Sequence, residues 1–196
     1  HTATDAAGAT TTFTYTPQGR IATATNALGE VTTYSYSADG LLATIDRPLP
    51  GASDSTTFTY DTAVCRLLPA TVTAADGYTH AFQYDAFDRV TRITHPDGTF
   101  EEFAYDRLHL SASRDRAGRW THYEVDHQRR LVEERDPLDR VTLFLRTPEG
   151  HIEELLDPLG RATRWTRDLN GVVMAKTYPD GAGYQLGYDA NGRLLS

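Results

Sequence analysis

The chain has 196 residues and a formal net charge of −8, with a sequence pI near 5.3. Nucleic-acid binding typically uses a clustered basic surface, so this acidic balance argues against a nucleic-acid partner. A single cysteine excludes an internal disulfide framework. No apolar run is long enough to cross a bilayer as a helix, so we expect no membrane span.

A pattern of about 21 residues returns nine times, and three columns define it. The tyrosine column contains Tyr15, Tyr36, Tyr60, Tyr84, Tyr105, Val125, Arg146, Arg167 and Tyr188. Two positions earlier, the aromatic column contains Phe13, Tyr34, Phe58, Phe82, Phe103, Tyr123, Phe144, Trp165 and Leu186. Seven positions before the tyrosine column, the glycine column contains Gly8, Gly29, Ser53, Gly77, Gly98, Gly118, Asp139, Gly160 and Gly181. Spacing kept through nine copies indicates a tandem array over residues 1–196.

The second copy shows what one unit predicts. Residues 30–37 are rich in threonine, valine and tyrosine and contain no proline, which favours a strand. Residues 38–40 (Ala-Asp-Gly) are typical of a tight turn, and residues 41–45 read as the return strand. Each copy is therefore a β-hairpin, and nine copies predict an antiparallel meander of about eighteen strands with no helix.

Further along the chain, the third copy carries insertions at residues 47–55 and 64–70, which we expect to form longer loops. Linking turns follow at residues 95–98, 115–118, 136–139, 157–160 and 178–181. Their proline, aspartate and glycine content predicts a second kind of turn, which alternates with the Gly-Arg-Leu turns inside the hairpins.

The expected structural core consists of residues from the two side-chain columns. Side chains two apart on a strand share one face, so each hairpin can stack its aromatic residues against the next hairpin. We interpret the aromatic column as the anchor, because the tyrosine column also accepts valine and arginine. The aspartate after the tyrosine is expected to accept backbone N–H bonds in the turn. The predicted repeat core is Phe13, Tyr15, Tyr34, Tyr36, Phe58, Tyr60, Phe82, Tyr84, Phe103, Tyr105, Tyr123, Phe144, Trp165, Leu186 and Tyr188.

The sequence offers no catalytic, cofactor-binding or metal-binding constellation. Glutamate pairs occur at residues 101–102, 133–134 and 153–154, but adjacent strand residues point to opposite faces. The seven histidines form no recognised ligand motif, and nucleophile-elbow and phosphate-loop patterns do not occur. We therefore expect a protein without enzymatic activity and without a cofactor.

The pattern Tyr188-Asp-Ala-Asn-Gly-Arg-Leu194, with Tyr84-Asp85, Tyr105-Asp106 and the linker at residues 157–161, resembles the YD repeats of Rhs proteins. Similar repeats occur in the C components of Tc toxins and in animal teneurins. The resemblance covers essentially the whole chain. It implies a curved, spiralling strip of antiparallel hairpins that forms part of a hollow β-shell.

The resemblance also implies a function. In bacterial members the shell encloses a variable C-terminal toxin, so we expect this chain to be a fragment of a longer shell that encapsulates or scaffolds a toxin. Its partners would be other segments of the same shell and the enclosed toxin domain. Open strand edges also predict edge-to-edge self-association. The protein would be a secreted or delivered bacterial effector.

An alternative function is a glycan- or protein-binding adhesion module on the same repeat sheet. Exposed aromatic residues such as Trp120 and Trp165 would serve it. The exposure of these residues separates the two interpretations: we expect Trp165 to be mostly buried because it stands in the aromatic column, whereas Trp120 lies outside the three columns.

Overall fold

The computed structural model describes residues 1–48, 54–61, 67–189 and 191–195, and these residues form β-strands and no helix. The strands are β1 (Thr2–Thr4), β2 (Thr10–Tyr15), β3 (Ile21–Thr25), β4 (Val31–Tyr36), β5 (Leu42–Asp46), β6 (Thr56–Tyr60), β7 (Pro69–Thr73), β8 (Thr79–Tyr84), β9 (Val90–Thr94), β10 (Phe100–Asp106), β11 (His109–Arg114), β12 (Trp120–Val125), β13 (Leu131–Arg135), β14 (Val141–Arg146), β15 (Ile152–Leu156), β16 (Ala162–Arg167), β17 (Val173–Thr177) and β18 (Gly183–Gln185). In the described part of the chain, no helix is long and apolar enough to span a membrane. Residues 49–53 and 64–66 of the expected loop insertions of the third copy lie outside the described residues.

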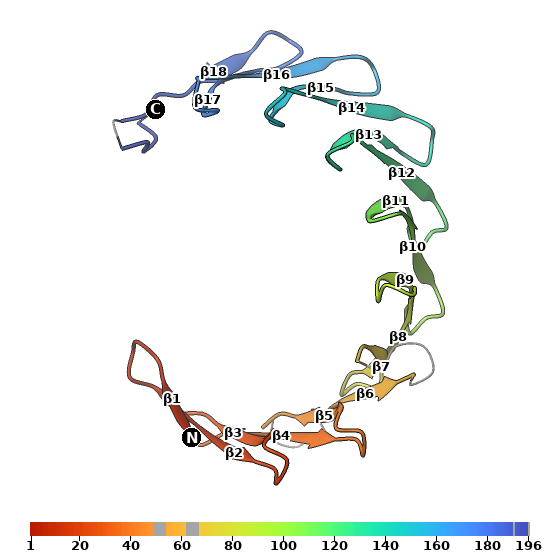
Figure 1. The fold of residues 1–196 in the computed structure, drawn as a ribbon, viewed down its shortest axis with the longest axis vertical. Helices are drawn as coiled ribbons and strands as arrows, with labels where there is room; N and C mark the ends of the chain where they lie inside the picture. The colour runs from red at the N-terminus through yellow and green to blue at the C-terminus, as the bar shows by residue number, and fades with distance from the viewer. Residues whose placement is uncertain (49–53, 62–66, 190, 196) are drawn as a thin grey trace. The chain divides into compact units, whose positions relative to one another are not determined.

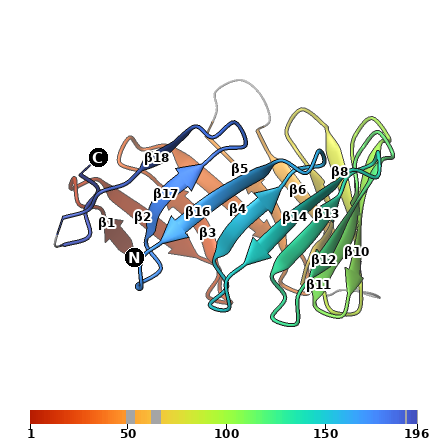
Figure 2. The ribbon, with the colours of Figure 1, turned by 90° about the horizontal axis from the view of Figure 1, so that it is seen from above.

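Consecutive strands pair antiparallel within each of two compact units, His1–Glu102 and Phe103–Ser196. Strand β10 begins in the first unit and ends in the second. Within each unit, the strands lie side by side in chain order along a curved band (Figure 1). The turns lie at the two edges of that band (Figure 2). The predicted all-β fold of antiparallel hairpins, with eighteen strands in the sheet, is confirmed.

The turns at the two edges share one hydrogen-bond pattern. In the hairpin turn 37–41 and the linking turn 115–119, the first N–H donates to the fifth carbonyl and the fourth N–H to the first carbonyl, at 2.8–2.9 Å. The fourth residue has positive φ in both, 81° at Gly40 and 83° at Gly118. The expectation of a second kind of turn is therefore wrong. The turns at the two edges differ in amino-acid composition. Their backbone conformation is the same, because each is a tight turn that ends in a residue with left-handed backbone.

A β-bulge distinguishes the hairpins from the links between them. The register of β4 against β5 shifts between Ser35 and Tyr36, so that Tyr36 faces Leu42 and Ser35 faces Thr44. The same shift precedes the tyrosine column in six further hairpins, whereas the linking pair β3–β4 keeps its register. Bulges bend a strand and increase its twist, and their repetition at one edge accounts for the curvature of the band within each unit.

The two faces of the sheet differ in burial. In β4 the side chains alternate between exposed and half-buried, and Tyr34 and Tyr36 lie on the half-buried side. We call the side that carries both side-chain columns the aromatic face and the other side the opposite face. Among the described residues, only Ala112 is a buried hydrophobic residue. Each unit thus lacks a fully enclosed core, as expected for strands arranged in one layer.

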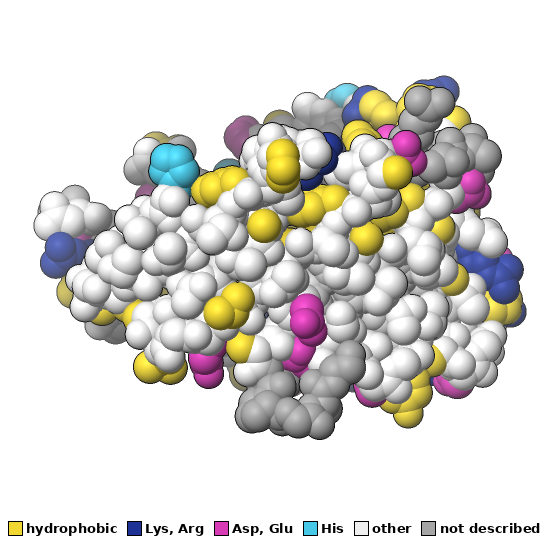
Figure 3. All heavy atoms as spheres, turned by 90° about the horizontal axis from the view of Figure 1, so that it is seen from below, with side chains coloured by type: hydrophobic (Ala, Val, Ile, Leu, Met, Phe, Trp, Pro, Cys, Tyr) yellow, Lys and Arg dark blue, Asp and Glu magenta, His cyan; other side chains and the backbone are white. Residues whose placement is uncertain are grey.

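The opposite face of the first unit is rich in threonine. Residues 1–98 contain 21 threonines, and paired hydroxyls of neighbouring strands lie 2.6–3.0 Å apart at Thr4–Thr10, Thr14–Thr23, Ser35–Thr44, Thr59–Thr71 and Thr73–Thr79. In Figure 3, backbone and uncharged polar side chains together cover most of the visible face, and charged side chains are few. These hydroxyl pairs tie neighbouring strands together on the side that carries no aromatic column.

Candidate functional site

The aromatic column packs within its own hairpin. Phe58 lies opposite Val72, and Phe144 lies opposite Leu155. Pairs of this kind contribute about 0.2–1 kcal/mol each. All nine members are half-buried: Phe13, Tyr34, Phe58, Phe82, Phe103, Tyr123, Phe144, Trp165 and Leu186. The burial of this column is therefore partial, because no second layer covers it among the described residues.

Most members of the tyrosine column link their hairpin to the one before it. The Tyr36 hydroxyl donates to the Ile21 carbonyl at 2.8 Å, and Ile21 is the residue opposite Tyr15 at the preceding bulge. The same bond, from a hydroxyl to the first residue of the previous return strand, joins Tyr60 to Leu42, Tyr84 to Pro69 and Tyr188 to Val173, at 2.9–3.0 Å. These bonds form a ladder across the aromatic face, which we call the bulge ladder.

Arginine replaces tyrosine in the bulge ladder without loss of the contact. Arg146 Nε donates to the Leu131 carbonyl at 3.1 Å, and its Nη1 donates to the Gly150 carbonyl at 3.0 Å in its own turn. Arg167 repeats the arrangement, with the carbonyls of Ile152 at 3.4 Å and Gly171 at 2.9 Å. The guanidinium therefore joins two hairpins and also braces a turn, which a phenol hydroxyl cannot do.

The remaining members of the tyrosine column differ in their surroundings. Tyr15, in the first copy, is 43% exposed, and its ring packs edge-on against His1 with centroids 5.6 Å apart. Tyr105 is half-buried, as are Tyr36, Tyr60, Tyr84 and Tyr188. Sequence reasoning missed the role of this column. The signal was the spacing from the tyrosine or arginine back to an aliphatic residue or proline at the start of a return strand, which is 15 residues in five hairpins and 18 at Tyr60.

Aspartates at the first position of the turns form a second recurring contact. Asp136 Oδ1 accepts the N–H groups of Leu138 and Arg140 at 2.8 and 3.0 Å, and its Oδ2 lies 2.6 Å from Arg140 Nη2. Equivalent pairs join Asp85 to Arg89, Asp115 to Arg119, Asp126 to Arg130 and Asp157 to Arg161. The prediction that the aspartate after the tyrosine accepts backbone N–H bonds is confirmed at Asp85, Asp126 and Asp189.

These contacts lower the pKa of the aspartates. The side-chain hydrogen bond from Arg140 is the main reason that the pKa of Asp136 lies below its usual value. At Asp157 the backbone N–H of Arg161 is the main cause of a lowered pKa. The pKa values of Asp85, Asp115 and Asp126 are lowered in the same way. All five carboxylates are therefore structural acceptors held in their charged form, and their environment is unsuited to general-acid catalysis at neutral pH.

The glycines of the hairpin turns make room for side chains of the preceding copy. A Cβ on Gly40 would collide with the Arg20 guanidinium, which also lies 5.5 Å from the centre of the Tyr36 ring. His151 occupies the corresponding position against Gly171. Glycine leaves room for these side chains, and the positive φ of the turn favours it there.

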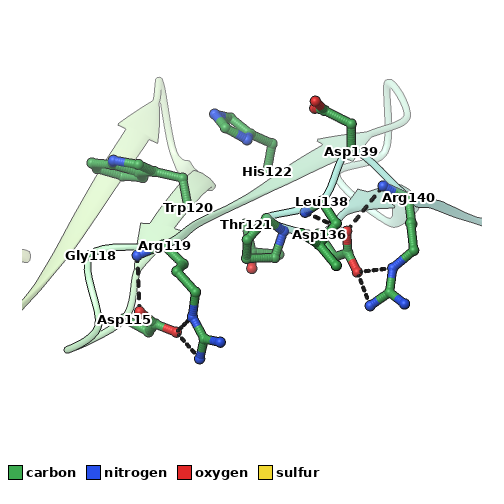
Figure 4. Close-up of a pocket in the computed structure, with 11 residues that line it drawn as sticks. Asp115, Gly118, Arg119, Trp120, Thr121, His122, Asp136, Leu138, Asp139 and Arg140 are labelled. Atoms are coloured by element: carbon green, nitrogen blue, oxygen red, sulfur yellow. Dashed lines mark hydrogen bonds and ion pairs between the residues drawn. The ribbon is translucent and has the colours of Figure 1, made fainter.

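An open hollow lies at the linking-turn edge of the second unit. Turns 115–119 and 136–140 and the start of β12 enclose a volume of about 740 Å³. Trp120 and His122 rise from β12 on one side of it, and the Asp139 carboxylate lies further along that side (Figure 4). Trp120 is 37% exposed, whereas Trp165 is half-buried beside the Lys176 ammonium, 5.3 Å from the ring centre. Among the described residues, no group of three or more histidine, cysteine, aspartate or glutamate side chains could hold a metal ion.

The bulge ladder, the turn aspartates and the glycine contacts all connect one copy to itself or to the next. They define a structural protein built from stacked β-hairpin repeats. Residues 4–161 match the model of the teneurin YD-shell family, and the chain belongs to this family. The predicted resemblance to YD-repeat proteins is confirmed.

Three solved structures have a similar fold. The crystal structure of TcdB2-TccC3-Cdc42 aligns with a TM-score of 0.57 at 13% identity, over 95% of this chain and 13% of that one. TcdB2-TccC3 without its hypervariable C-terminal region gives 0.56 at 13% identity over the same shares. TcdB2-TccC3-TEV gives 0.54 at 16% identity, over 96% of this chain and 13% of that one. The likeness is one of fold, and this chain spans about an eighth of the proteins it resembles. Among curated proteins, none matches the chain.

Proposed function

We propose that this chain is a noncatalytic wall segment of a YD-repeat shell that encloses or scaffolds a C-terminal toxin. The observation that carries the proposal is the bulge ladder, which ties six hairpins to their predecessors through backbone acceptors. A wall that shields a cargo needs such links between neighbouring hairpins, and it needs no reactive group. The family supports a structural shell segment. TcdB2-TccC3, which has a similar fold, carries a hypervariable C-terminal region, and this supports a C-terminal cargo.

The proposed partners follow from the same arrangement. The single array over residues 1–196 would be one stretch of a longer shell, flanked by further hairpins of the same polypeptide. The cargo would be a nonrepetitive C-terminal domain. The protein would act as a bacterial effector outside the cell that makes it, because a shell serves a toxin that must be delivered.

Protease accessibility of the cargo in the complete polypeptide tests the proposal. We expect the C-terminal domain to resist protease at concentrations that digest the same domain expressed alone. Substitution of the ladder residues Tyr60→Phe and Arg146→Met together should speed its digestion, whereas the matched control Tyr15→Phe should leave the rate unchanged. Digestion of the domain at the same rate inside and outside the shell would refute the proposal, as would a polypeptide with no nonrepetitive domain after the repeats.

A further inference from the structure

Two histidines lie next to each other at the linking-turn edge of the first unit. His80 is on β8, and His95 is the first residue of turn 95–98, where its N–H donates to the Thr99 carbonyl. Their ring centres are 5.2 Å apart and their planes meet at 81°, so the rings do not stack face to face. Both side chains are half-buried. The pairing of β8 with β9 brings these two side chains together from distant places in the sequence.

The repeat itself requires neither histidine. His80 stands four positions before the tyrosine column, where six other copies have threonine: Thr11, Thr32, Thr56, Thr121, Thr142 and Thr163. His95 stands at the first turn position, where Asp136 and its equivalents accept backbone N–H groups. In turn 95–98 this role passes to Asp97, whose Oδ1 accepts the Thr99 N–H at 3.1 Å. The imidazole pair is therefore a local departure from the repeat.

A carboxylate holds one of the two imidazole rings. Glu101 occupies the same column position as His80, one copy later, and its Oε2 lies 3.1 Å from His95 Nε2. When Nε2 donates its proton to this carboxylate, His95 presents the lone pair of Nδ1. Within the described part of the chain, His95 Nδ1 and the ring nitrogens of His80 make no hydrogen bond. A carboxylate behind a ligating histidine fixes the tautomer and raises the basicity of the free nitrogen.

We propose that His80 and His95 bind a divalent metal ion of the zinc class, with Glu101 as the residue that positions His95. Zinc–nitrogen bonds of about 2.0–2.1 Å in a tetrahedral site place the centres of two imidazole rings about 5 Å apart. The observed separation of 5.2 Å agrees with this value. Imidazole nitrogen suits zinc, copper and nickel, whereas Mg²⁺ and Ca²⁺ prefer oxygen ligands. The described residues supply no third ligand, so water would complete the coordination sphere.

The bound ion would join β8 to the turn that leads from β9 into β10. It would bind the folded chain in preference to the unfolded chain and would therefore stabilise the end of the first unit. The site does not depend on the shell function, because metal affinity can be measured whether or not the protein encloses a cargo.

Isothermal titration of the purified chain with ZnCl₂ tests the site. We expect saturable binding that His80→Thr and His95→Asn each abolish. The repeat uses threonine and asparagine at these two positions, so both variants should fold, and circular dichroism checks this. Glu101→Gln should weaken binding by about tenfold. Ring-nitrogen NMR should show the ion on His95 Nδ1 with the Nε2 proton retained, a signature that a merely structural role of Glu101 would not produce.

Two other histidines serve as controls. His127 is exposed in turn 126–130, and His1 carries an amino group that can itself bind Zn²⁺, so neither His127→Ala nor His1→Ala should change the affinity of the proposed site. Zn²⁺ should raise the thermal midpoint of the unmodified chain but not that of His80→Thr. Absence of saturable binding would overturn the proposal, as would equal affinity in His80→Thr. An equal response to MgCl₂ would also overturn it, because that would assign the ion to surface carboxylates.

Discussion

The hydrogen bond of the tyrosine hydroxyl accounts for the preference for tyrosine in the tyrosine column, which ring size alone does not explain. Tyr60 is half-buried, and burial raises the pKa of its phenol, so the hydroxyl remains a donor at all ordinary pH values. Its acceptor, the Leu42 carbonyl, lies at a bulge, where the regular ladder of the sheet is interrupted. A side chain from the next copy thus donates a hydrogen bond to a backbone carbonyl at the bulge.

Removal of the tyrosine hydroxyl should lower the free energy of unfolding more at Tyr60 than at Tyr15. Tyr60→Phe leaves the Leu42 carbonyl without its donor, and we expect a loss of about 1 kcal/mol in the free energy of unfolding. Tyr15→Phe removes the same atom from a residue that is 43% exposed and donates to none of the described residues, so its effect should stay within about 0.5 kcal/mol. Urea unfolding measures both values. Equal losses would show that the phenol ring, rather than its hydroxyl, stabilises the repeat.

The two hydrogen bonds of an arginine in the tyrosine column can be tested by comparing the stability of two variants. Arg146 donates to two carbonyls, and Arg146→Met keeps most of the side-chain length while losing both bonds. We expect Arg146→Met to lower the unfolding free energy by about 2 kcal/mol, and Arg146→Tyr to restore roughly half of that loss. Thermal unfolding gives the comparison. If methionine is tolerated as well as tyrosine, the column serves only for packing.

At the scale of a single hairpin, the positive φ of the fourth turn residue is a constraint that recurs through the described turns. Glycine occupies most of these positions with positive φ, but Arg129 also adopts φ of 62°. Left-handed backbone costs a residue with a Cβ about 1–2 kcal/mol. The strain at Arg129 is therefore a defect that the array tolerates.

Two substitutions at this turn position should act in opposite directions. Arg129→Gly relieves the strain, and we expect a gain of about 1 kcal/mol in the unfolding free energy. Gly160→Ala introduces it at φ of 73°, where a Cβ meets no neighbouring atom, so the expected loss of about 1 kcal/mol comes from the backbone alone. Chemical unfolding of both variants checks the signs. A stabilising Gly160→Ala would mean that the turn relaxes to another conformation.

The turn aspartates predict a dependence of stability on pH. Their pKa values in the folded protein lie below the ordinary value, so the unfolded chain takes up protons first as the pH falls. The stabilising effect is therefore complete above the ordinary aspartate pKa of about 3.9 and is lost as the pH falls through the lower folded values. We expect the thermal midpoint to fall steeply below about pH 4.

A triple variant isolates this effect. In the turn of Asn26, the side-chain oxygen accepts the N–H groups of Leu28 and Glu30, both at 3.0 Å, so asparagine can fill the acceptor position. Replacement of Asp115, Asp136 and Asp157 by asparagine should keep the turns closed and flatten the loss of stability in acid. Asp139→Asn serves as the control, since that carboxylate makes none of these bonds. An acid profile identical to that of the unmodified chain would contradict the assignment.

For the whole molecule, the repeat spacing was sufficient to predict the strand order and the hairpins, because successive antiparallel strands need only local pairing. The aromatic column was also found from the sequence, since its side chains face the same side of every hairpin. The bulge ladder was not predicted. It depends on a one-residue register shift, visible at Ser35 and Tyr36 only once the strands are paired. The Trp120 hollow also needed the structure, because its walls come from turns 115–119 and 136–140, which lie about one repeat apart in the sequence.

The edges of the array predict self-association. Strand β1 pairs with β2 on one side, and the proposed contact places a strand of another copy on its other side. The backbone atoms of His1 and Phe13 exchange hydrogen bonds of 3.1 and 2.7 Å. In an antiparallel pair, the residues of a strand bond to the partner strand alternately. Because Thr4 lies three residues after His1, its N–H points away from β2. Unpaired edge groups of this kind promote edge-to-edge pairing. We therefore expect light scattering to show a mass above that of the monomer, increasing with concentration.

Thr4→Pro should reduce this association, because proline removes the outward N–H and leaves the bonds to β2 in place. Thr4→Val is the matched control, since it removes the hydroxyl that contacts Thr10 but keeps the N–H. We expect the unmodified chain and Thr4→Val to associate to the same extent, and Thr4→Pro to associate much less. A chain that stays monomeric at every concentration would contradict edge pairing. Equal association of the proline variant would place the contact elsewhere in the molecule, away from the edge of β1.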